Sequence, residues 1–327
     1  MKITDLHQRT FDYIRIALNE KCNFRCMYCM PTEGIQFKPE DQLLSDDEIF
    51  RVVSVLAKHG VTKVRLTGGE PLIRKGISQL VNVISHTDGI KSVHLTTNGL
   101  YLDTFLQPLI DAGLDGLNIS LDTLREDRFF EITRRNDFPR VWKNVLSAIE
   151  LPEIHVKINV VLMRGINADE IPDFVNLARE YPVSVRFIEL MPFDDHQIWR
   201  TGRFMGVDMI MEALDKVIPT DKRQVGTPTE QYYFKPDGFA GGVAIIPAFA
   251  RSFCGACNRI RLTADGQIRN CLYSNREFNL RDLIRNGCSD EDIISLVQSA
   301  MHQKARDGFE AEHEDNHKRT SMTQIGG

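Results

Sequence analysis

The sequence lacks the usual features of nucleic-acid-binding, membrane and secreted proteins. It has no excess of positive charge, since 40 lysines and arginines face 45 acidic residues and the formal net charge is −5. This balance argues against a general nucleic-acid-binding surface and leaves room only for a local cationic pocket. No run approaches the roughly 18 apolar residues of a membrane span, and the first ten residues lack the apolar core of a signal peptide. We therefore expect a cytoplasmic protein that binds neither nucleic acid nor a membrane.

The 327 residues also lack a low-complexity linker and any repeat beyond an alternation of strand and helix patterns. Short β-branched runs alternate with amphipathic stretches, which predicts six βα units around a parallel sheet. The predicted strands are Tyr13–Leu18, Val61–Thr67, Ser92–Thr97, Gly116–Leu121, His155–Leu162 and Ser184–Leu190. Because a closed barrel needs eight units, we expect an α/β fold with an incomplete (βα)6 TIM-type barrel. A doubly wound sheet is the alternative.

The βα alternation ends near Pro192. Beyond it, Gln231–Phe234, Val243–Ile246 and Arg259–Leu262 have the pattern of short strands separated by Gly and Pro turns. This predicts a small, mainly antiparallel C-terminal region, with residues 1–195 forming the barrel and 196–327 the second region. The acid- and histidine-rich stretch Asp307–His317 is predicted to be a solvated segment.

Seven cysteines without a secretion signal are better explained as thiols and metal ligands than as disulfides. Cys22, Cys26 and Cys29 form C-x3-C-x2-C directly after the first predicted strand, where barrels place their chemistry. Three thiolates in one loop can bind three irons of a [4Fe-4S] cluster and leave the fourth iron open to an outside ligand. A zinc site lacking one ligand and buried free thiols are the alternatives.

A second group of three cysteines lies in the C-terminal region. Cys254, Cys257 and Cys271 form C-x2-C-x13-C, one ligand short of a closed zinc site. A second cluster with an iron open to substrate is one interpretation, and an incomplete zinc ribbon is the other. Cys288 lies in a predicted helix end and turn, and we assign it no metal role.

Two predicted strands carry paired cations on one face. The period of two in a strand puts Arg259 and Arg261 on the same side, while Ile260 points the other way. Lys63 and Arg65 repeat this arrangement on the second predicted strand. Paired cations are costly unless an anion lies between them, and arginine matches phosphate oxygens well. A bound triphosphate would satisfy them; the alternative is that each is an ordinary solvated charge.

Three motifs carry a resemblance to a known family. The first cysteine motif, with Tyr28 before its last cysteine, resembles the signature of the radical S-adenosylmethionine (SAM) superfamily. Gly68-Gly69-Glu70-Pro71, after the second predicted strand, resembles the SAM-binding segment of that superfamily. Cys-x2-Cys-Asn-Arg-Ile-Arg followed by a third cysteine resembles the GTP-cyclising family of molybdenum cofactor biosynthesis. Together the motifs cover almost the whole chain.

The resemblance implies two [4Fe-4S] clusters, SAM as co-substrate and a set of ligand-binding residues, although it names no catalytic side chain. The SAM-binding positions it implies are Tyr28, Gly69, Ser120 and Met191. The GTP-binding positions it implies are Arg15, Arg65, Thr96, Lys157, Arg259, Ile260 and Arg261. We add Lys63 from its place beside Arg65. The C-terminal pair Gly326 and Gly327 matches a tail that reaches into the active site in this family, where the absence of a Cβ suits a crowded pocket.

The activity implied by the resemblance is that of a lyase that converts GTP to 3′,8-cyclo-7,8-dihydroguanosine 5′-triphosphate by radical chemistry. The implied partners are an electron donor such as flavodoxin or ferredoxin and a downstream cyclic pyranopterin monophosphate synthase, for a monomer or a homodimer. Two alternatives stay open at this point. One is a radical SAM enzyme with an auxiliary cluster that acts on a peptide or another small molecule, and the other is a non-enzymatic iron-sulfur or zinc protein.

Overall fold

The computed structural model describes residues 2–191, 202–218, 224–225, 232–312, 319 and 321–326. The predicted domain boundary between residues 195 and 196 lies outside these residues, as does Gly327, so the division into 1–195 and 196–327 stays a prediction.

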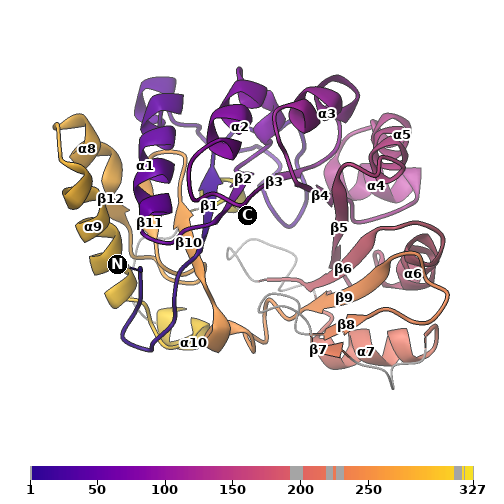
Figure 1. The fold of residues 1–327 in the computed structure, drawn as a ribbon. Coiled ribbons are helices and arrows are strands. Elements are labelled where there is room, and N and C mark those ends of the chain that lie inside the picture. The colour runs from indigo at the N-terminus through magenta and orange to yellow at the C-terminus, as the bar shows by residue number, and fades with distance from the viewer. Residues whose placement is uncertain are drawn as a thin grey trace.

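A single curved sheet organises the described part of the chain (Figure 1). Its strands follow the order β12-β11-β10-β1-β2-β3-β4-β5-β6-β9-β8-β7. Their bounds are β1 Tyr13–Ala17, β2 Lys63–Thr67, β3 Ser92–Thr97, β4 Gly116–Ser120, β5 His155–Leu162, β6 Ser184–Glu189, β7 Gln224–Val225, β8 Tyr232–Phe234, β9 Gly242–Ile246, β10 Arg259–Leu262, β11 Gln267–Arg269 and β12 Phe278–Asn279.

The central strands β1 to β6 are parallel and consecutive, which confirms the incomplete (βα)6 barrel. The C-terminal strands were expected to form a small appended region. The structure shows that they extend the barrel sheet at both edges, because β10 pairs parallel with β1 and β9 pairs parallel with β6. Within the described sheet, the antiparallel pairs are β10–β11, β11–β12, β7–β8 and β8–β9. Pairing in this way covers the two edges that an open barrel would otherwise expose.

The helices pack outside the curved sheet, as Figure 1 shows for α1 to α6. Their bounds are α1 Asp46–Lys58, α2 Ile77–Ser85, α3 Leu102–Asp111, α4 Glu126–Thr133, α5 Phe138–Ile149, α6 Ile171–Glu180, α7 Val207–Asp215, α8 Leu280–Arg285, α9 Asp290–His302 and α10 Gly308–Glu312. Local sequence fixes several of their starts. Ser45 caps α1 and accepts a hydrogen bond from the backbone N–H of Glu48, whose side chain accepts one from Ser45 in return.

The two faces of the sheet differ in chemistry. Most residues at every second position of the central strands are apolar and pack under the helices, as Ile14 and Ile16 of β1 do with no exposed surface. The alternate residues face the inside of the curve, and many of them are charged or polar, such as Arg15 and Arg65. Closed barrels fill this space with bulky apolar side chains. Here the polar lining keeps the interior suited to a ligand.

Two details differ from the expectations. Within the stretch Asp307–His317, residues 308–312 form helix α10, which buries Gly308 and Ala311 while Phe309, Glu310 and Glu312 stay exposed, so only one side of this helix is packed. Arg251 fixes this helix by donating a hydrogen bond to the carbonyl of Gly308 at 2.6 Å; residues 313–317 lie outside the described part.

The strands β7, β11 and β12 were not predicted because two or three residues carry no readable period. No helix in the described residues is long and apolar enough to cross a membrane.

Candidate active site

The first cysteine loop follows β1 and is held by the chain that ends α4. The backbone N–H groups of Arg25 and Met27 donate to the carbonyls of Thr133 and Ile132. Arg134, just past the helix, donates back to the carbonyl of Arg25 at 2.7 Å. These bonds fix the loop between its first and last cysteines. The structure therefore presents Cys22, Cys26 and Cys29 from a braced loop.

The three thiols of this loop, Cys22, Cys26 and Cys29, influence one another electrostatically. Burial raises the pKa of Cys26, and the neighbouring thiol of Cys29 raises it further. Burial and the charge of Cys22 raise the pKa of Cys29 to about 12. Thiolates at such positions need a compensating positive charge, which cluster iron supplies. The donor set therefore fits an iron-sulfur cluster.

The glycine segment Gly68-Gly69 lies directly against the chain that enters the first cysteine loop. Gly68 has a φ of +132°, a conformation that side chains rarely allow. A Cβ at Gly69 would lie 2.1 Å from the carbonyl oxygen of Lys21, so only glycine permits this approach. The N–H of Gly69 donates to the carbonyl of Asn19 at 2.9 Å. The glycine motif and the cysteine motif are therefore one packed unit.

Glu70 of the same motif had no role assigned from the sequence. Its carboxylate is 1% exposed and accepts hydrogen bonds from the Thr97 hydroxyl and from the N–H groups of Asn98 and Leu72, at 2.7, 2.8 and 3.0 Å. Burial raises the pKa of Glu70 to about 7, against these hydrogen bonds. Glu70 thus joins the ends of β2 and β3 and holds the glycine segment in place.

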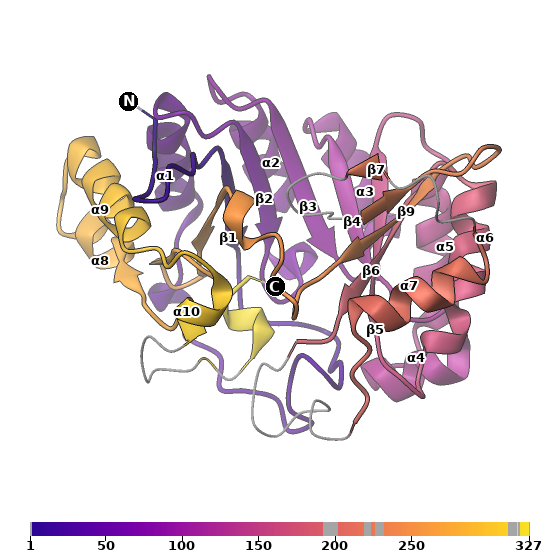
Figure 2. The ribbon, with the colours of Figure 1, turned by 90° about the horizontal axis from the view of Figure 1, so that it is seen from below.

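The remaining predicted SAM positions lie at the carboxyl ends of the parallel strands, which point to one side of the molecule in Figure 2. Ser120 ends β4, and Met191 follows β6. Tyr28, within the first cysteine loop, donates its hydroxyl proton at 2.7 Å to Asp122, which follows β4. The Met191 sulfur accepts a hydrogen bond from Tyr273 at 3.7 Å.

The second cysteine group is assembled by a hairpin. Cys254 and Cys257 border a 3-10 turn just before β10, and Cys271 follows β11. Because β10 and β11 pair antiparallel, with Arg261 opposite Arg269, the chain returns and brings Cys271 back toward the first two cysteines. Burial raises the pKa of Cys254, and the Cys271 thiol adds to the rise. The hairpin therefore makes one group of three cysteines that are distant in sequence.

Cations surround this second group. Burial would raise the pKa of Cys257, but the charges of Arg259 and Lys304 lower it to about 6. Lys304 is 4% exposed and donates to the carbonyl of Asn270. Arg9 donates to the carbonyl of Cys254 at 3.0 Å. Among the described residues, no three metal-binding side chains converge on one ion; in a cluster, each thiolate binds a different iron, so convergence on one point is not required.

A row of arginines crosses the inner face of the sheet. Arg15 on β1 is paired in register with Arg261 on one side and Arg65 on the other. Tyr13 lies two residues before Arg15 on the same face of β1. It is paired in register with Arg259 of β10 and with Lys63 of β2. The structure thus brings together four of the predicted GTP-binding arginines from three strands. It also places Lys63 beside them, with its ammonium 5.3 Å from the centre of the Tyr13 ring.

Two arginines of this row are almost completely buried. Arg261 is 3% and Arg65 is 7% exposed. Burial and the charge of Arg259 lower the pKa of Arg261 to about 10. One buried guanidinium nitrogen on each of Arg65, Arg259 and Arg261 has no hydrogen-bonding partner. A bound polyanion would neutralise the row and accept these bonds.

The other predicted GTP positions are placed less uniformly. Thr96 and Lys157 are both paired with Asn118, so they form a second inner row, and the Thr96 hydroxyl and an Asn118 oxygen are buried without partners. Ile260 is fully buried in the main apolar core on the opposite face, so its side chain does not face this interior. Only its backbone is left for a ligand contact.

Sequence reasoning missed two inner-face residues. His94 is paired with Arg65, and Arg186 with Asn159. Burial and the charges of Lys63 and Arg65 lower the pKa of His94 to about 2, so its imidazole is neutral. The sequence pattern could have identified them, because His94 and Arg186 both occupy polar positions in strands where apolar and polar residues alternate.

The described C-terminal residues 321–326 reach the inside of the curve, beside β1 and β2 (Figure 1). Gly326 is buried, with a φ of +74°. A Cβ there would lie 3.2 Å from the Thr67 methyl and 3.3 Å from the Ala17 Cβ. The described glycine of the predicted tail therefore reaches the carboxyl ends of the first two strands.

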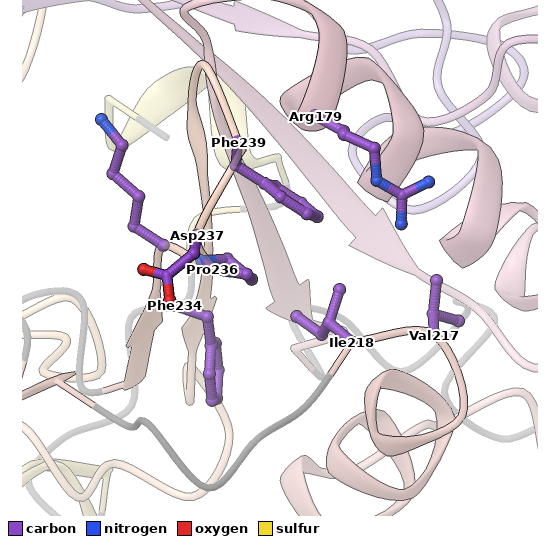
Figure 3. A pocket seen from close by; sticks show the side chains of 8 residues that line it. Arg179, Val217, Ile218, Phe234, Pro236, Asp237 and Phe239 are labelled. Carbon is purple, nitrogen blue, oxygen red and sulfur yellow. The ribbon is translucent and has the colours of Figure 1, made fainter.

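A separate cavity of about 350 Å³ lies away from both cysteine groups (Figure 3). It is lined by Arg179 of α6, the chain after α7 and the turn between β8 and β9. The Arg179 guanidinium lies 5.1 Å from the centre of the Phe239 ring. This cavity contains none of the predicted site residues.

Two families match the chain. The radical SAM superfamily matches residues 16–178, and Molybdenum Cofactor Synthesis C matches residues 183–309. Among solved structures, SuiB of Streptococcus suis bound to S-adenosylmethionine has a TM-score of 0.60 and 16% identity, over 91% of this chain and 69% of that chain. At that identity the likeness shows the fold alone.

Curated relatives are much closer in sequence. GTP 3′,8-cyclase of Chlorobaculum tepidum is 44% identical over 99% of this chain and 97% of its own length. Mitochondrial GTP 3′,8-cyclase of Arabidopsis thaliana is 44% identical over 92% of this chain and 77% of its own. Molybdenum cofactor biosynthesis protein moc-5 of Caenorhabditis elegans is 46% identical over 92% of this chain, which spans only 50% of that longer relative. The chain belongs to the GTP 3′,8-cyclase family of the radical SAM superfamily.

Proposed function

We propose that this chain is a GTP 3′,8-cyclase, which converts GTP to (8S)-3′,8-cyclo-7,8-dihydroguanosine 5′-triphosphate in the first step of molybdenum cofactor biosynthesis. The relationship to the cyclase of Chlorobaculum tepidum over nearly the whole of both chains supports this activity. The observation that carries the substrate assignment is the arginine row on β10, β1 and β2, which offers buried guanidinium groups to a triphosphate.

Membership of the radical SAM superfamily implies SAM and an iron-sulfur cluster. We propose that the chain holds two [4Fe-4S] clusters, one on Cys22, Cys26 and Cys29, and one on the cysteines that the β10–β11 hairpin assembles. Together with SAM, the first cluster would supply the radical that abstracts hydrogen from the ribose of GTP. The second would bind the guanine base.

The protein residues would hold the two ligands in contact and exclude water. Gly69, Ser120 and Met191 stand at or just beyond the carboxyl ends of β2, β4 and β6, and Tyr28 stands in the first cysteine loop; we propose that these four residues bind SAM. Arg15, Arg65, Arg259 and Arg261 would bind the triphosphate, and the neutral imidazole of His94 adds no further positive charge next to them. Thr96 and Lys157 would contact the nucleoside from the second inner row, and the Ile260 backbone would complete the contact. Gly326 and Gly327 would enter beside them from the C-terminus.

We further propose that a flavodoxin or ferredoxin supplies the electron and that a cyclic pyranopterin monophosphate synthase takes the product. The chain would act as a monomer or homodimer.

The deciding experiment is an anaerobic assay of the reconstituted protein with SAM, GTP and dithionite. We expect 5′-deoxyadenosine and the cyclised nucleotide to form together, and only when GTP is present, as followed by mass spectrometry. If deoxyadenosine forms while GTP stays unchanged, the substrate assignment fails and a radical SAM enzyme with another substrate is favoured. If neither product forms with both clusters intact, the protein is not this enzyme.

Tyr13 offers a spectroscopic report on the triphosphate pocket. Burial would raise the pKa of Tyr13, but Arg65, Arg15, Lys63 and Arg259 together lower it to about 8. Folding therefore favours the ionised form of Tyr13. The stability that this side chain contributes is complete above pH 10, its ordinary pKa, and is lost as the pH falls through about 8.

We expect a tyrosinate absorbance at 295 nm with a midpoint near pH 8 in the metal-free protein, absent from a Tyr13→Phe variant. Bound GTP should raise that midpoint, because its triphosphate neutralises the surrounding cations. A midpoint that GTP at saturating concentration leaves unchanged would show that the triphosphate binds elsewhere.

A further inference from the structure

A network of charged side chains joins both cysteine loops to the end of the chain. It consists of Glu20, Lys38, Asp265, Glu277 and Arg319, which we call the Arg319 network. Glu20 and Lys38 flank the first cysteine loop, Asp265 lies in the turn between β10 and β11, and Glu277 follows Cys271. Arg319 belongs to the C-terminal tail. None of these residues was identified from the sequence.

Arg319 is the centre of this network. Its guanidinium contacts Glu277 at 2.7 and 2.8 Å, Asp265 at 3.0 Å and Glu20 at 3.7 Å. Lys38 also binds Asp265, and the backbone N–H of Lys38 donates to Glu20 at 3.1 Å. One guanidinium thus links carboxylates from three separate segments, which suits the planar fork of arginine.

Three of these charged groups are largely buried, so each needs an oppositely charged partner. The side chains of Glu20, Asp265 and Arg319 are 2%, 3% and 11% exposed. Burial would raise the pKa of Asp265, but Arg319 and Lys38 outweigh it and lower the value. Without Arg319, the three carboxylates would be left with Lys38 on Asp265 and with Arg269, which contacts Glu277 at 3.3 Å, so Glu20 would lose its contact with a cation.

The tail beyond Arg319 packs against the first cysteine loop. The Ser321 hydroxyl donates to the carbonyl of Cys29 at 2.9 Å, and the Met322 N–H donates to the same oxygen at 3.4 Å. A short 3-10 turn, Met322–Gln324, follows, and Ser321 caps it. The turn delivers Gly326 to the ends of β1 and β2. Arg319 is therefore the charged anchor of a tail that touches the loop of the first cluster.

We propose that Arg319 is a positioning residue: by binding Glu20, Asp265 and Glu277 together, it seats the C-terminal tail in the active site only when both cysteine loops are in place. The inference rests on the proposed function, because it gives the tail a role in the cyclase reaction. An unseated tail leaves SAM cleavage possible but separates it from cyclisation of the nucleotide.

Hydrogen exchange of the metal-free protein, without SAM or GTP, tests the anchoring independently of activity. In Arg319→Gln, we expect the amides of Met322, Gln324 and Ile325 to exchange roughly ten- to a hundredfold faster, as expected for lost hydrogen bonds to charged groups, while the sheet amides keep their protection. Arg140→Gln is the matched control, because it removes an arginine from an exposed pair with Asp103. Unchanged tail exchange in Arg319→Gln would overturn the proposal.

Glu277→Gln provides a second test in case Arg319→Gln does not fold, because the Glu277 side chain is 25% exposed and its replacement disturbs the interior less. It should loosen the tail in the same way, and the double variant should add little to either single change, because both break one network. Independent, additive effects would contradict a shared anchor. Arg319→Lys should restore part of the protection, because one ammonium group keeps the charge but cannot bridge three carboxylates.

Turnover of the cluster-loaded enzyme then tests the role in the reaction. We expect Arg319→Gln to form deoxyadenosine in several-fold excess over cyclised nucleotide, while the wild type and Arg140→Gln keep the two products coupled. A tail that exchanges fast while the products stay coupled would overturn the positioning role. If the wild type fails to cyclise GTP but its tail is anchored through Arg319, the proposed function fails and the anchor remains.

Discussion

Replacing Cys26 by serine is expected to abolish SAM cleavage and GTP conversion together, whereas replacing Cys257 by serine should stop only the conversion of GTP. Cys26 lies in the braced loop beside the glycine segment, and Cys257 lies in the second group, where Arg259 and Lys304 lower its pKa to about 6. Since each group would hold its own cluster, we expect about eight irons per wild-type chain and about four in each variant. Iron analysis and the anaerobic assay measure both effects.

Cys288→Ser is the matched control for these variants. This half-buried cysteine packs against the core between α8 and α9, away from either group of three. It should keep about eight irons and full coupling. A Cys257→Ser protein that retains the wild-type iron content would contradict the second cluster, and a Cys26→Ser protein that still cleaves SAM would contradict the first.

Gly69→Ala is expected to prevent SAM binding and to destabilise the protein. The added Cβ would lie 2.1 Å from the carbonyl oxygen and 2.5 Å from the carbonyl carbon of Lys21, and neither is the end of a flexible side chain. The backbone must therefore shift just before Cys22, at a cost of about 1–3 kcal/mol or more. Thermal unfolding and calorimetric titration with SAM measure the two consequences.

Gly255→Ala serves as the comparison, because a Cβ at this position meets no atom within 4 Å and its φ is not in the left-handed region. It should unfold at the wild-type temperature and bind SAM normally. Equal losses in the two variants would show that the close packing of Gly69 on the first cysteine loop is not the cause.

Local patterns were enough to predict the central architecture. Every one of the six predicted barrel strands is present, with ends that differ by at most two residues, as in β2, predicted from Val61 and observed from Lys63. The alternation of Arg259, Ile260 and Arg261 is also correct, since both arginines face inward and Ile260 is buried outward. These features depend on neighbouring residues and a regular period, which a sequence displays directly.

The sequence did not predict features that depend on long-range register. Nothing local indicates that β10 pairs with β1 and β9 with β6, so the continuation of the sheet at both edges was missed. The same pairing decides that Arg15 lies between Arg65 and Arg261, which turns isolated basic residues into one row.

Residue type and spacing are enough to define the two cysteine groups, the glycine segment and the polar inner positions of the strands. How these groups come together in space depends on the packing of distant segments. The hairpin returns Cys271 to its partners, and Arg319 reaches three carboxylates that lie between 42 and 299 residues away in the chain. Such contacts arise from the packing of separate segments, whose mutual distances in space are not encoded in any local pattern.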